Sequence, residues 1–149
     1  MAVVTCMVNS FKGEILKEGH QLESDTLKMA LIKSGESRTY DHVIENYSEL
    51  IASTTDEVAN GNGYTTGGKT LQNASLVIDQ TNDVAHVDFD DVTWTSATIS
   101  ASGALIYNTS NSNKAVAVIS FGGTVASTAG TFNIQLPAAG HNTSLIRIA

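Results

Sequence analysis

A glycine-rich stretch holds the sharpest match to a chemical motif in this sequence. Residues 63–70 read GYTTGGKT, which fits the phosphate-loop pattern G-x-x-x-x-G-K-[ST] from Gly63 to Thr70. In a nucleotide-binding protein, the backbone N–H groups of such a loop surround the phosphates, and the lysine, here Lys69, binds their terminal oxygens. The pattern therefore raises the hypothesis of a nucleotide-binding enzyme.

The residues around this motif do not fit that chemistry. A phosphate loop leaves a buried strand and begins a helix, because the N-terminal end of the helix helps to hold the phosphates. Here residues 54–59 are polar and acidic, and residues 71–78, LQNASLVI, alternate like a strand. The sequence therefore favours a glycine-rich turn that leads into a strand, with nucleotide binding as the remote alternative.

One histidine and three aspartates, His86, Asp88, Asp90 and Asp91, lie close together in the sequence. Carboxylate oxygens can bind a hard cation such as Ca²⁺ or Mg²⁺. The twelve-residue ligand spacing of a helix–loop–helix calcium site, with its closing glutamate, is not found here. We expect solvated side chains at a strand edge and a turn, and no metal site.

Catalytic motifs are not found in the sequence. The histidines His20, His42, His86 and His141 are scattered, and neither H-E-x-x-H nor G-x-S-x-G occurs. The single cysteine, Cys6, excludes an internal disulfide, and we expect it to be a small buried side chain in the first helix. We therefore predict no catalytic residues, no cofactor and no enzyme activity.

The secondary structure predicted from the sequence is mainly β-strand. Residues 92–122 have the composition and spacing that are most typical of strands. Branched and aromatic side chains fill two arms, which are joined by a polar turn at residues 108–113, NTSNSN. In the second arm, Val116 and Val118 alternate with Ala117 and Ile119, so both faces of the strand are apolar. Such a strand belongs in the middle of a sheet or in a sheet covered on both sides.

An amphipathic helix is predicted over about residues 3–18. Apolar side chains recur there at the helical spacings of three and four residues; they are Val4, Met7, Val8, Phe11 and Ile15. Gly19 follows as a typical residue for a helix end. Further strands are predicted at residues 27–32, 71–79, 84–89, 131–136 and 145–149, and residues 40–50 fit a short helix.

Length, composition and charge limit the classes of protein to which this chain can belong. The 149 residues predict one domain, and 42% hydrophobic with 15% charged residues is a composition typical of β-sandwiches. The net charge of −7, without clusters of Lys and Arg, argues against nucleic acid or an anionic membrane as a partner. No signal peptide or apolar run of membrane-spanning length is found, so we expect synthesis and folding in the cytoplasm.

Sequence blocks along most of the chain resemble a family of small virion proteins of tailed bacteriophages. The blocks are SFKGEIL at 10–16, LKMAL at 27–31, GNGYTTGGKTL at 61–71, FDDVTW at 89–94, ALIYN at 104–108, KAVAV at 114–118, SFGG at 120–123 and IRIA at 146–149. The resemblance implies a G-x-G-Y-x-x-G-G loop in which the lysine is not required. Residues 36–50 depart from the family pattern, which has a shorter, threonine-rich connection there.

The predicted fold is a single domain over residues 1–149 of the α+β class, mainly β. We expect an antiparallel β-sandwich with the N-terminal amphipathic helix and a β-rich region over residues 27–149. The resemblance implies a non-enzymatic structural protein of the virion, foremost a capsid decoration or cement protein bound to the major capsid protein. A tail, neck or fibre-associated protein of the virion is the alternative.

Self-association is the last expectation from the sequence. A strand that is apolar on both faces needs more cover than one short helix and one opposing sheet supply, and exposed apolar patches generally mark partner surfaces. We predict a homo-oligomer, with a trimer as the first hypothesis because capsid lattices offer threefold positions. The predicted interaction residues are Val116, Val118, Phe11 and Tyr64.

Overall fold

The computed structural model describes residues 1–17, 19–52 and 55–149. Strands make up 47% of the chain and helix 10%, so the chain is mainly β, as predicted. The strands are β1 (Cys6–Met7), β2 (Leu27–Lys33), β3 (Lys69–Thr70), β4 (Ser75–Asp79), β5 (Val84–Asp88), β6 (Val92–Asn108), β7 (Lys114–Ile134) and β8 (Ile146–Ile148). The helices are α1 (Asn9–Ile15), α2 (Ser48–Ile51) and the 3₁₀ turn η1 (Thr109–Asn111).

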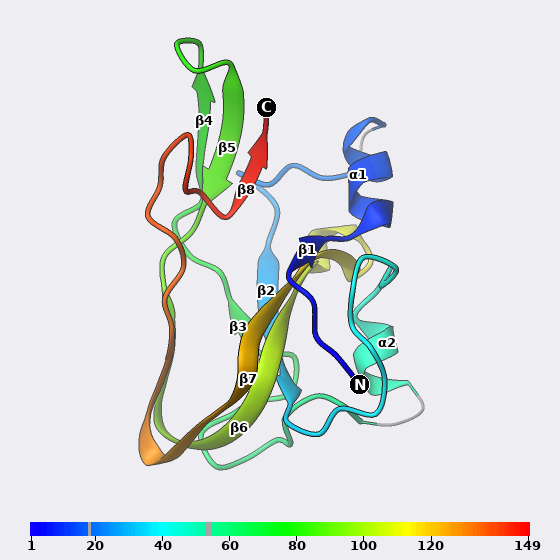
Figure 1. Cartoon of the computed structure of the whole chain (residues 1–149), viewed down its shortest axis with the longest axis vertical. Coiled ribbons are helices and arrows are strands. Elements are labelled where there is room, and N and C mark those ends of the chain that lie inside the picture. Colours follow the sequence, from blue (N-terminus) through cyan, green and yellow to red (C-terminus); the bar gives the residue numbers. More distant parts are fainter. Residues whose placement is uncertain (18, 53–54) are drawn as a thin grey trace.

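The strands form two antiparallel sheets. The larger has the order β1-β7-β6-β2-β3, and the smaller has the order β4-β5-β8. The three-stranded sheet lies at one end of the molecule, and its β4–β5 hairpin projects beyond the other elements (Figure 1). Buried apolar side chains of both sheets belong to one core, in which Val87 and Ile146 of the smaller sheet join Trp94 and Phe132 of the larger.

The β6–β7 hairpin is the centre of the fold, as the sequence predicted. The two strands pair from Val92 opposite Ile134 to Asn108 opposite Lys114. The polar turn is held by the Asn108 side chain, which accepts a hydrogen bond from the backbone N–H of Ser110. Between two paired positions, β7 has the four residues 121–124 where β6 has only residue 102. The hairpin bends sharply there and runs back towards the three-stranded sheet (Figure 1).

The second arm of the hairpin lies inside its sheet, as expected for a strand with two apolar faces. β7 has β6 on one side and β1 on the other, where Cys6 pairs with Val118 and Met7 with Ala117. Helix α1 packs against β7, and its Phe11 is fully buried. Val116 and Val118 are fully buried as well. Ala115 and Ala117, which point to the other face, are 0% and 6% exposed, so the chain itself covers both faces of this part of the strand.

The N-terminal helix is shorter than predicted. It spans seven residues, Asn9–Ile15, instead of residues 3–18, and Cys6 lies in β1 rather than in the helix. Residues 6–7 gain backbone hydrogen bonds from β7 that a helix here would forgo. The helix ends where the N–H groups of Lys17 and Gly19 both bond to the carbonyl oxygen of Glu14.

The boundaries of other elements also differ from the prediction. The strand expected at 71–79 is reduced to β4, because residues 71–74 form no ladder. The strand expected at 131–136 is the last part of β7, which ends at Ile134. The helix expected within residues 40–50 is limited to α2, Ser48–Ile51.

Candidate functional site

The glycine-rich loop encloses a buried carboxylate. Glu57 is 2% exposed, and its Oε1 accepts hydrogen bonds from the Tyr64 hydroxyl and the Gly67 N–H, each at 2.6 Å. Its Oε2 accepts a third from the Tyr47 hydroxyl, also at 2.6 Å. The Tyr64 hydroxyl in turn accepts from the backbone N–H of Leu31 at 3.0 Å. These bonds tie the loop to the middle of β2.

A second buried carboxylate, Asp56, lies next to the first in sequence. It accepts hydrogen bonds from the N–H and hydroxyl of Ser37 and from the Tyr40 hydroxyl, and Lys33 Nζ lies 3.4 Å from its Oδ1. Burial by itself would raise the pKa of Asp56, but these hydrogen bonds outweigh it and hold the pKa below its ordinary value. Asp56 therefore stabilises the fold above its ordinary pKa, and this contribution is lost as the pH falls.

All four tyrosines of the chain belong to this arrangement, which we call the tyrosine–carboxylate cluster: Tyr40, Tyr47, Tyr64, Tyr107, Asp56 and Glu57. The Tyr107 ring stacks on the Tyr47 ring at a centroid distance of 4.4 Å, and the Tyr107 hydroxyl donates to the Gly67 carbonyl. The cluster is buried and its carboxylates accept bonds from the chain itself. Its role is to fasten residues 37–47 and 56–67 to β2 and β6.

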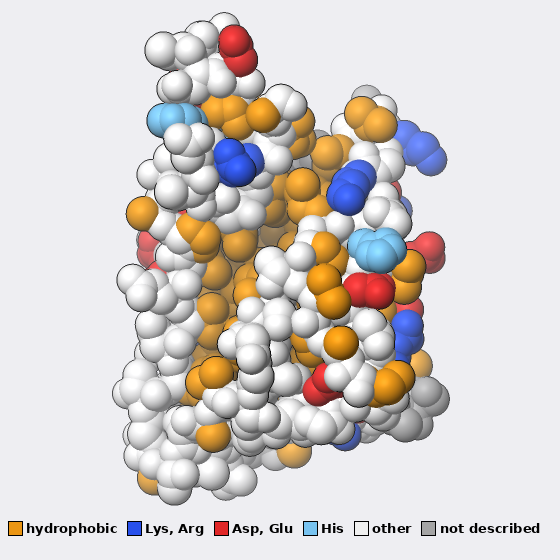
Figure 2. All heavy atoms as spheres, in the orientation of Figure 1, with side chains coloured by type: hydrophobic (Ala, Val, Ile, Leu, Met, Phe, Trp, Pro, Cys, Tyr) orange, Lys and Arg blue, Asp and Glu red, His pale blue; other side chains and the backbone are white. Residues whose placement is uncertain are grey.

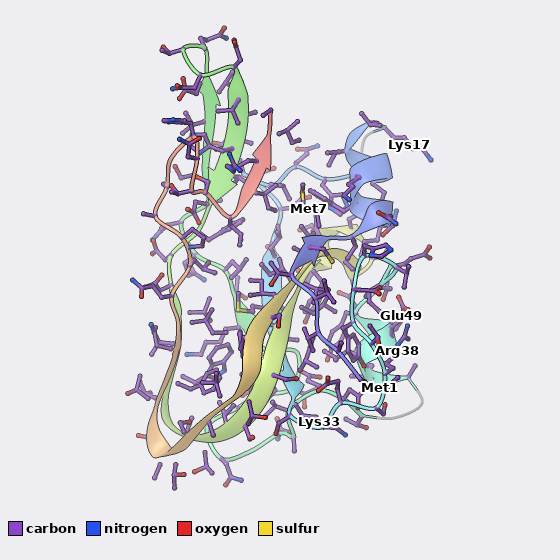
Figure 3. All side chains as sticks on the ribbon, viewed as in Figure 1. Met1, Met7, Lys17, Lys33, Arg38 and Glu49 are labelled. Carbon is purple, nitrogen blue, oxygen red and sulfur yellow. The ribbon has the colours of Figure 1, made fainter. Side chains whose placement is uncertain are left out.

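The segment before α2 is also held at the surface. Arg38 Nη1 lies 3.4 Å from Glu49 Oε1, and the two side chains lie together beside α2 (Figure 3). The other oxygen of Glu49, Oε2, accepts from the N–H groups of Glu45 and Asn46. Residues 36–50 supply two of the four tyrosines, Tyr40 and Tyr47.

Alkaline pH should unfold the protein through this cluster. Burial, with the adjacent Glu57 carboxylate, raises the pKa of Tyr107 to about 12. Burial and hydrogen bonds to the carboxylates also raise the pKa values of Tyr40, Tyr47 and Tyr64. Above pH 10 the unfolded chain releases these protons and the folded chain keeps them, so the free energy of unfolding falls by up to about 1.4 kcal/mol per pH unit for each tyrosine. Urea unfolding at pH 8, 9, 10 and 11 measures this loss, whereas tyrosinate absorbance that rises near pH 10 in the folded protein would contradict it.

The phosphate-loop motif does not have the structure that nucleotide binding requires. The residues after Gly68 form β3, which pairs with β2, and no helix follows Lys69. Lys69 Nζ donates a hydrogen bond to the Thr93 carbonyl oxygen at 2.5 Å and lies 5.8 Å from the centroid of the Trp94 ring. The glycine-rich turn leads into a strand, as expected, but this strand is the two-residue β3, and the strand expected over residues 71–78 begins only at Ser75.

Replacing Lys69 with alanine should have a small effect. The side chain is exposed, so its hydrogen bond and its position over Trp94 contribute about 1 kcal/mol or less. We expect the Lys69→Ala protein to fold normally and to show the same response to ATP and GTP as the unchanged protein. Calorimetric titration of both proteins checks this, and nucleotide binding that disappears in the variant would support the nucleotide-binding alternative.

The histidine and the three aspartates do not form a metal site among the described residues. No group of three or more His, Cys, Asp or Glu side chains there could hold a metal ion. Asp90 and Asp91 are exposed, as expected. His86 and Asp88 are buried, contrary to expectation, because the Ser144 hydroxyl lies 2.8 Å from His86 Nδ1 and brings residues 138–145 over this face of β5.

An open hollow of about 640 Å³ lies beside these aspartates. It is lined by Asp88, Asp90 and Asp91, and by the chain around Pro137. Burial raises the pKa of Asp88, whose Oδ2 has no hydrogen-bond partner among the described residues. Asp91 Oδ1 accepts from the Leu136 N–H, and Asp90 Oδ2 from the Asn73 amide, so these carboxylates hold loops together.

The four predicted interaction residues are not on the surface. Val116, Val118 and Phe11 are fully buried, and Tyr64 is 2% exposed. The valines belong to the hydrophobic core of the chain itself, and the Tyr64 hydroxyl is bound to Glu57. The alternation around Val116 and Val118 predicted side chains that need cover, and the same molecule supplies it.

Several exposed apolar side chains gather on one face of the three-stranded sheet, while others are scattered over the rest of the surface. Ile78 is 68% exposed, Ile148 52% and Leu76 41%. Figure 2 shows hydrophobic side chains gathered over this sheet and along a furrow that runs down the same face of the molecule. The furrow holds two adjoining hollows of about 290 and 270 Å³ that share Ile119. Alternation along β4 predicted the strand itself, but no signal showed that its apolar side would remain exposed.

Comparison with known proteins adds no family to these findings. No protein-family model matches this chain, and no curated protein or solved structure is detectably similar to it. Among the described residues, no helix is both long enough and apolar enough to cross a membrane.

Proposed function

We propose that this chain is a non-enzymatic structural protein of a tailed-bacteriophage virion, foremost a decoration or cement protein on the major capsid protein lattice. The observation that carries the proposal is the exposed apolar face of the three-stranded sheet, with Leu76, Ile78 and Ile148. Contiguous apolar surface of this kind generally marks a site of contact with another protein. The sequence blocks that resemble small virion proteins supply the class of partner.

The glycine-rich loop agrees with a structural role. It is the one segment with the spacing of a nucleotide site, and its Tyr64 and Gly67 are bound to Glu57 inside the fold. We also propose that the two sheets act as the layers of a sandwich, because Val87 and Ile146 share one core with Trp94. Self-association remains part of the proposal. The trimer expected from capsid symmetry is the alternative to the twofold pairing proposed below, and the mass in solution decides between them.

Copy number in purified particles tests the proposed function. A decoration protein approaches the copy number of the major capsid protein, whereas the alternative, a tail, neck or fibre-associated protein, is present in far fewer copies. Quantitative mass spectrometry of gradient-purified virions from the phage that encodes this chain measures the ratio. We expect a copy number close to that of the major capsid protein. Absence of the chain from the particles would contradict any role in the virion.

A further inference from the structure

The strand β4 forms an open edge of the smaller sheet. It pairs with β5 on one side, and no strand of the described chain pairs with its other side. Its first four residues are exposed, and the run Leu76-Val77-Ile78 contains no charge and no proline. Proteins normally protect such an edge with charges, proline or a covering element, because an exposed apolar edge pairs with other strands.

The other three edge strands are shorter. β1 and β3 have only two residues each, and β8 has three, with the charged Arg147 in the middle. The outer side of β7 beyond Val118 also has no paired strand among the described residues, but its residues 124–131 are mostly small or polar, whereas β4 has three consecutive large apolar side chains. The tip of the β4–β5 hairpin projects beyond the larger sheet, and the loop that leads from β7 to β8 passes beside the lower part of β4 (Figure 1). Residues 75–78 of β4 are nevertheless exposed, so another chain can reach this edge. β4 is therefore the edge that is most suited to pairing.

The sequence of β4 is complementary to itself in antiparallel pairing. When two β4 strands pair with Val77 opposite Val77, Leu76 lies opposite Ile78 of the second copy, and Ser75 lies opposite its Asp79. The only charge in the strand thus faces a hydroxyl group. The two Asp79 residues are separated by four residues of strand, about 14 Å, which exceeds the Debye length of about 8 Å at physiological salt.

Registers centred on a neighbouring residue give less complementary pairs than the register centred on Val77. With Ile78 at the centre, Asp79 lies opposite Val77, and with Leu76 at the centre, Ile78 has no partner within the strand. In the register centred on Val77, the exposed Leu76 and Ile78 of both copies meet on one face of the joined sheet, because opposite residues share a face. On that face Ile78 already pairs with Ala85, and Ala85 with Ile148.

We propose that β4 pairs with β4 of a second copy of this chain about a twofold axis at Val77, which joins the two small sheets into one six-stranded sheet. The interface is isologous and closed, so it produces a dimer and no fibre. The proposal does not depend on a role in the virion, because it follows from the edge strand alone. Its failure would leave the copy-number experiment unaffected.

Disulfide trapping tests the register directly. In a Cys6→Ser background, Val77→Cys places two thiols opposite one another, with Cα atoms about 4.5–5.5 Å apart, within the reach of a disulfide. Ser75→Cys is the matched control, since it lies on the same exposed strand and face but about 14 Å from its counterpart in the dimer. Under mild oxidation we expect the Val77→Cys protein to form covalent dimers at least about tenfold faster.

A second variant and a mass measurement complete the test. The Ser75→Cys/Asp79→Cys protein should also form covalent dimers, since each new cysteine faces the other type across the axis. Multi-angle light scattering of the unchanged protein should show a mass that rises with concentration from 15.7 kDa towards twice that value. Equal oxidation rates for Val77→Cys and Ser75→Cys would overturn the proposal, as would a monomer at all concentrations or a mass that levels off at three copies.

Discussion

Replacing Glu57 with alanine is expected to lower the free energy of unfolding by about 3–5 kcal/mol. The change removes the common acceptor of the Tyr47 hydroxyl, the Tyr64 hydroxyl and the Gly67 N–H. Each buried donor left without a partner costs about 1–3 kcal/mol. Because domains of this size are stable by only about 5–15 kcal/mol, the variant should unfold at a much lower urea concentration.

Three further variants separate the cluster from a general loss of charge. Glu23 is exposed, so Glu23→Ala should change stability by less than about 0.5 kcal/mol. Tyr64→Phe removes one donor to Glu57 and the acceptor of the Leu31 N–H, and should cost about 1–3 kcal/mol. The double variant Glu57→Ala/Tyr64→Phe should cost less than the sum, because the two residues share one bond. Additive losses would show that the bond contributes nothing.

The fold could be predicted best where the signal is local. The β6–β7 hairpin follows from branched residues in two arms and a polar turn between them, all within residues 92–134. The N-terminal end differs from the prediction because Cys6 and Met7 pair with residues more than a hundred positions away. Their spacing fits a helix equally well, and only the distant strand decides between the two structures.

The tyrosine–carboxylate cluster could not be predicted from its residues. Asp56 and Glu57 are part of a polar, acidic stretch in the sequence, and a stretch of that kind is normally solvated. Both become buried because tyrosine hydroxyls reach them from residues 7–16 positions away. The same cluster explains the glycine-rich motif, which resembles a phosphate loop in its letters and binds a carboxylate of its own chain in the structure.

Replacing Gly68 with alanine is expected to cost more than about 3 kcal/mol and to impair folding. Gly68 has φ of +76°, which already disfavours a side chain. A Cβ atom there would lie 1.8 Å from the carbonyl oxygen of Met29 and 2.8 Å from the Cα of Ala30. Both atoms belong to the backbone of β2, which is held by its pairing with β6 and cannot move aside cheaply.

Gly35→Ala is the control that separates this contact from backbone strain. Gly35 has nearly the same φ, +73°, but a Cβ atom there meets nothing within 4 Å. It should therefore show only the cost of a left-handed alanine, about 1–2 kcal/mol. Urea unfolding of the two variants side by side measures the difference. If Gly68 served an open phosphate-binding loop, the two costs would be equal; a clearly larger loss for Gly68→Ala instead shows that this glycine is required because the loop packs directly on β2.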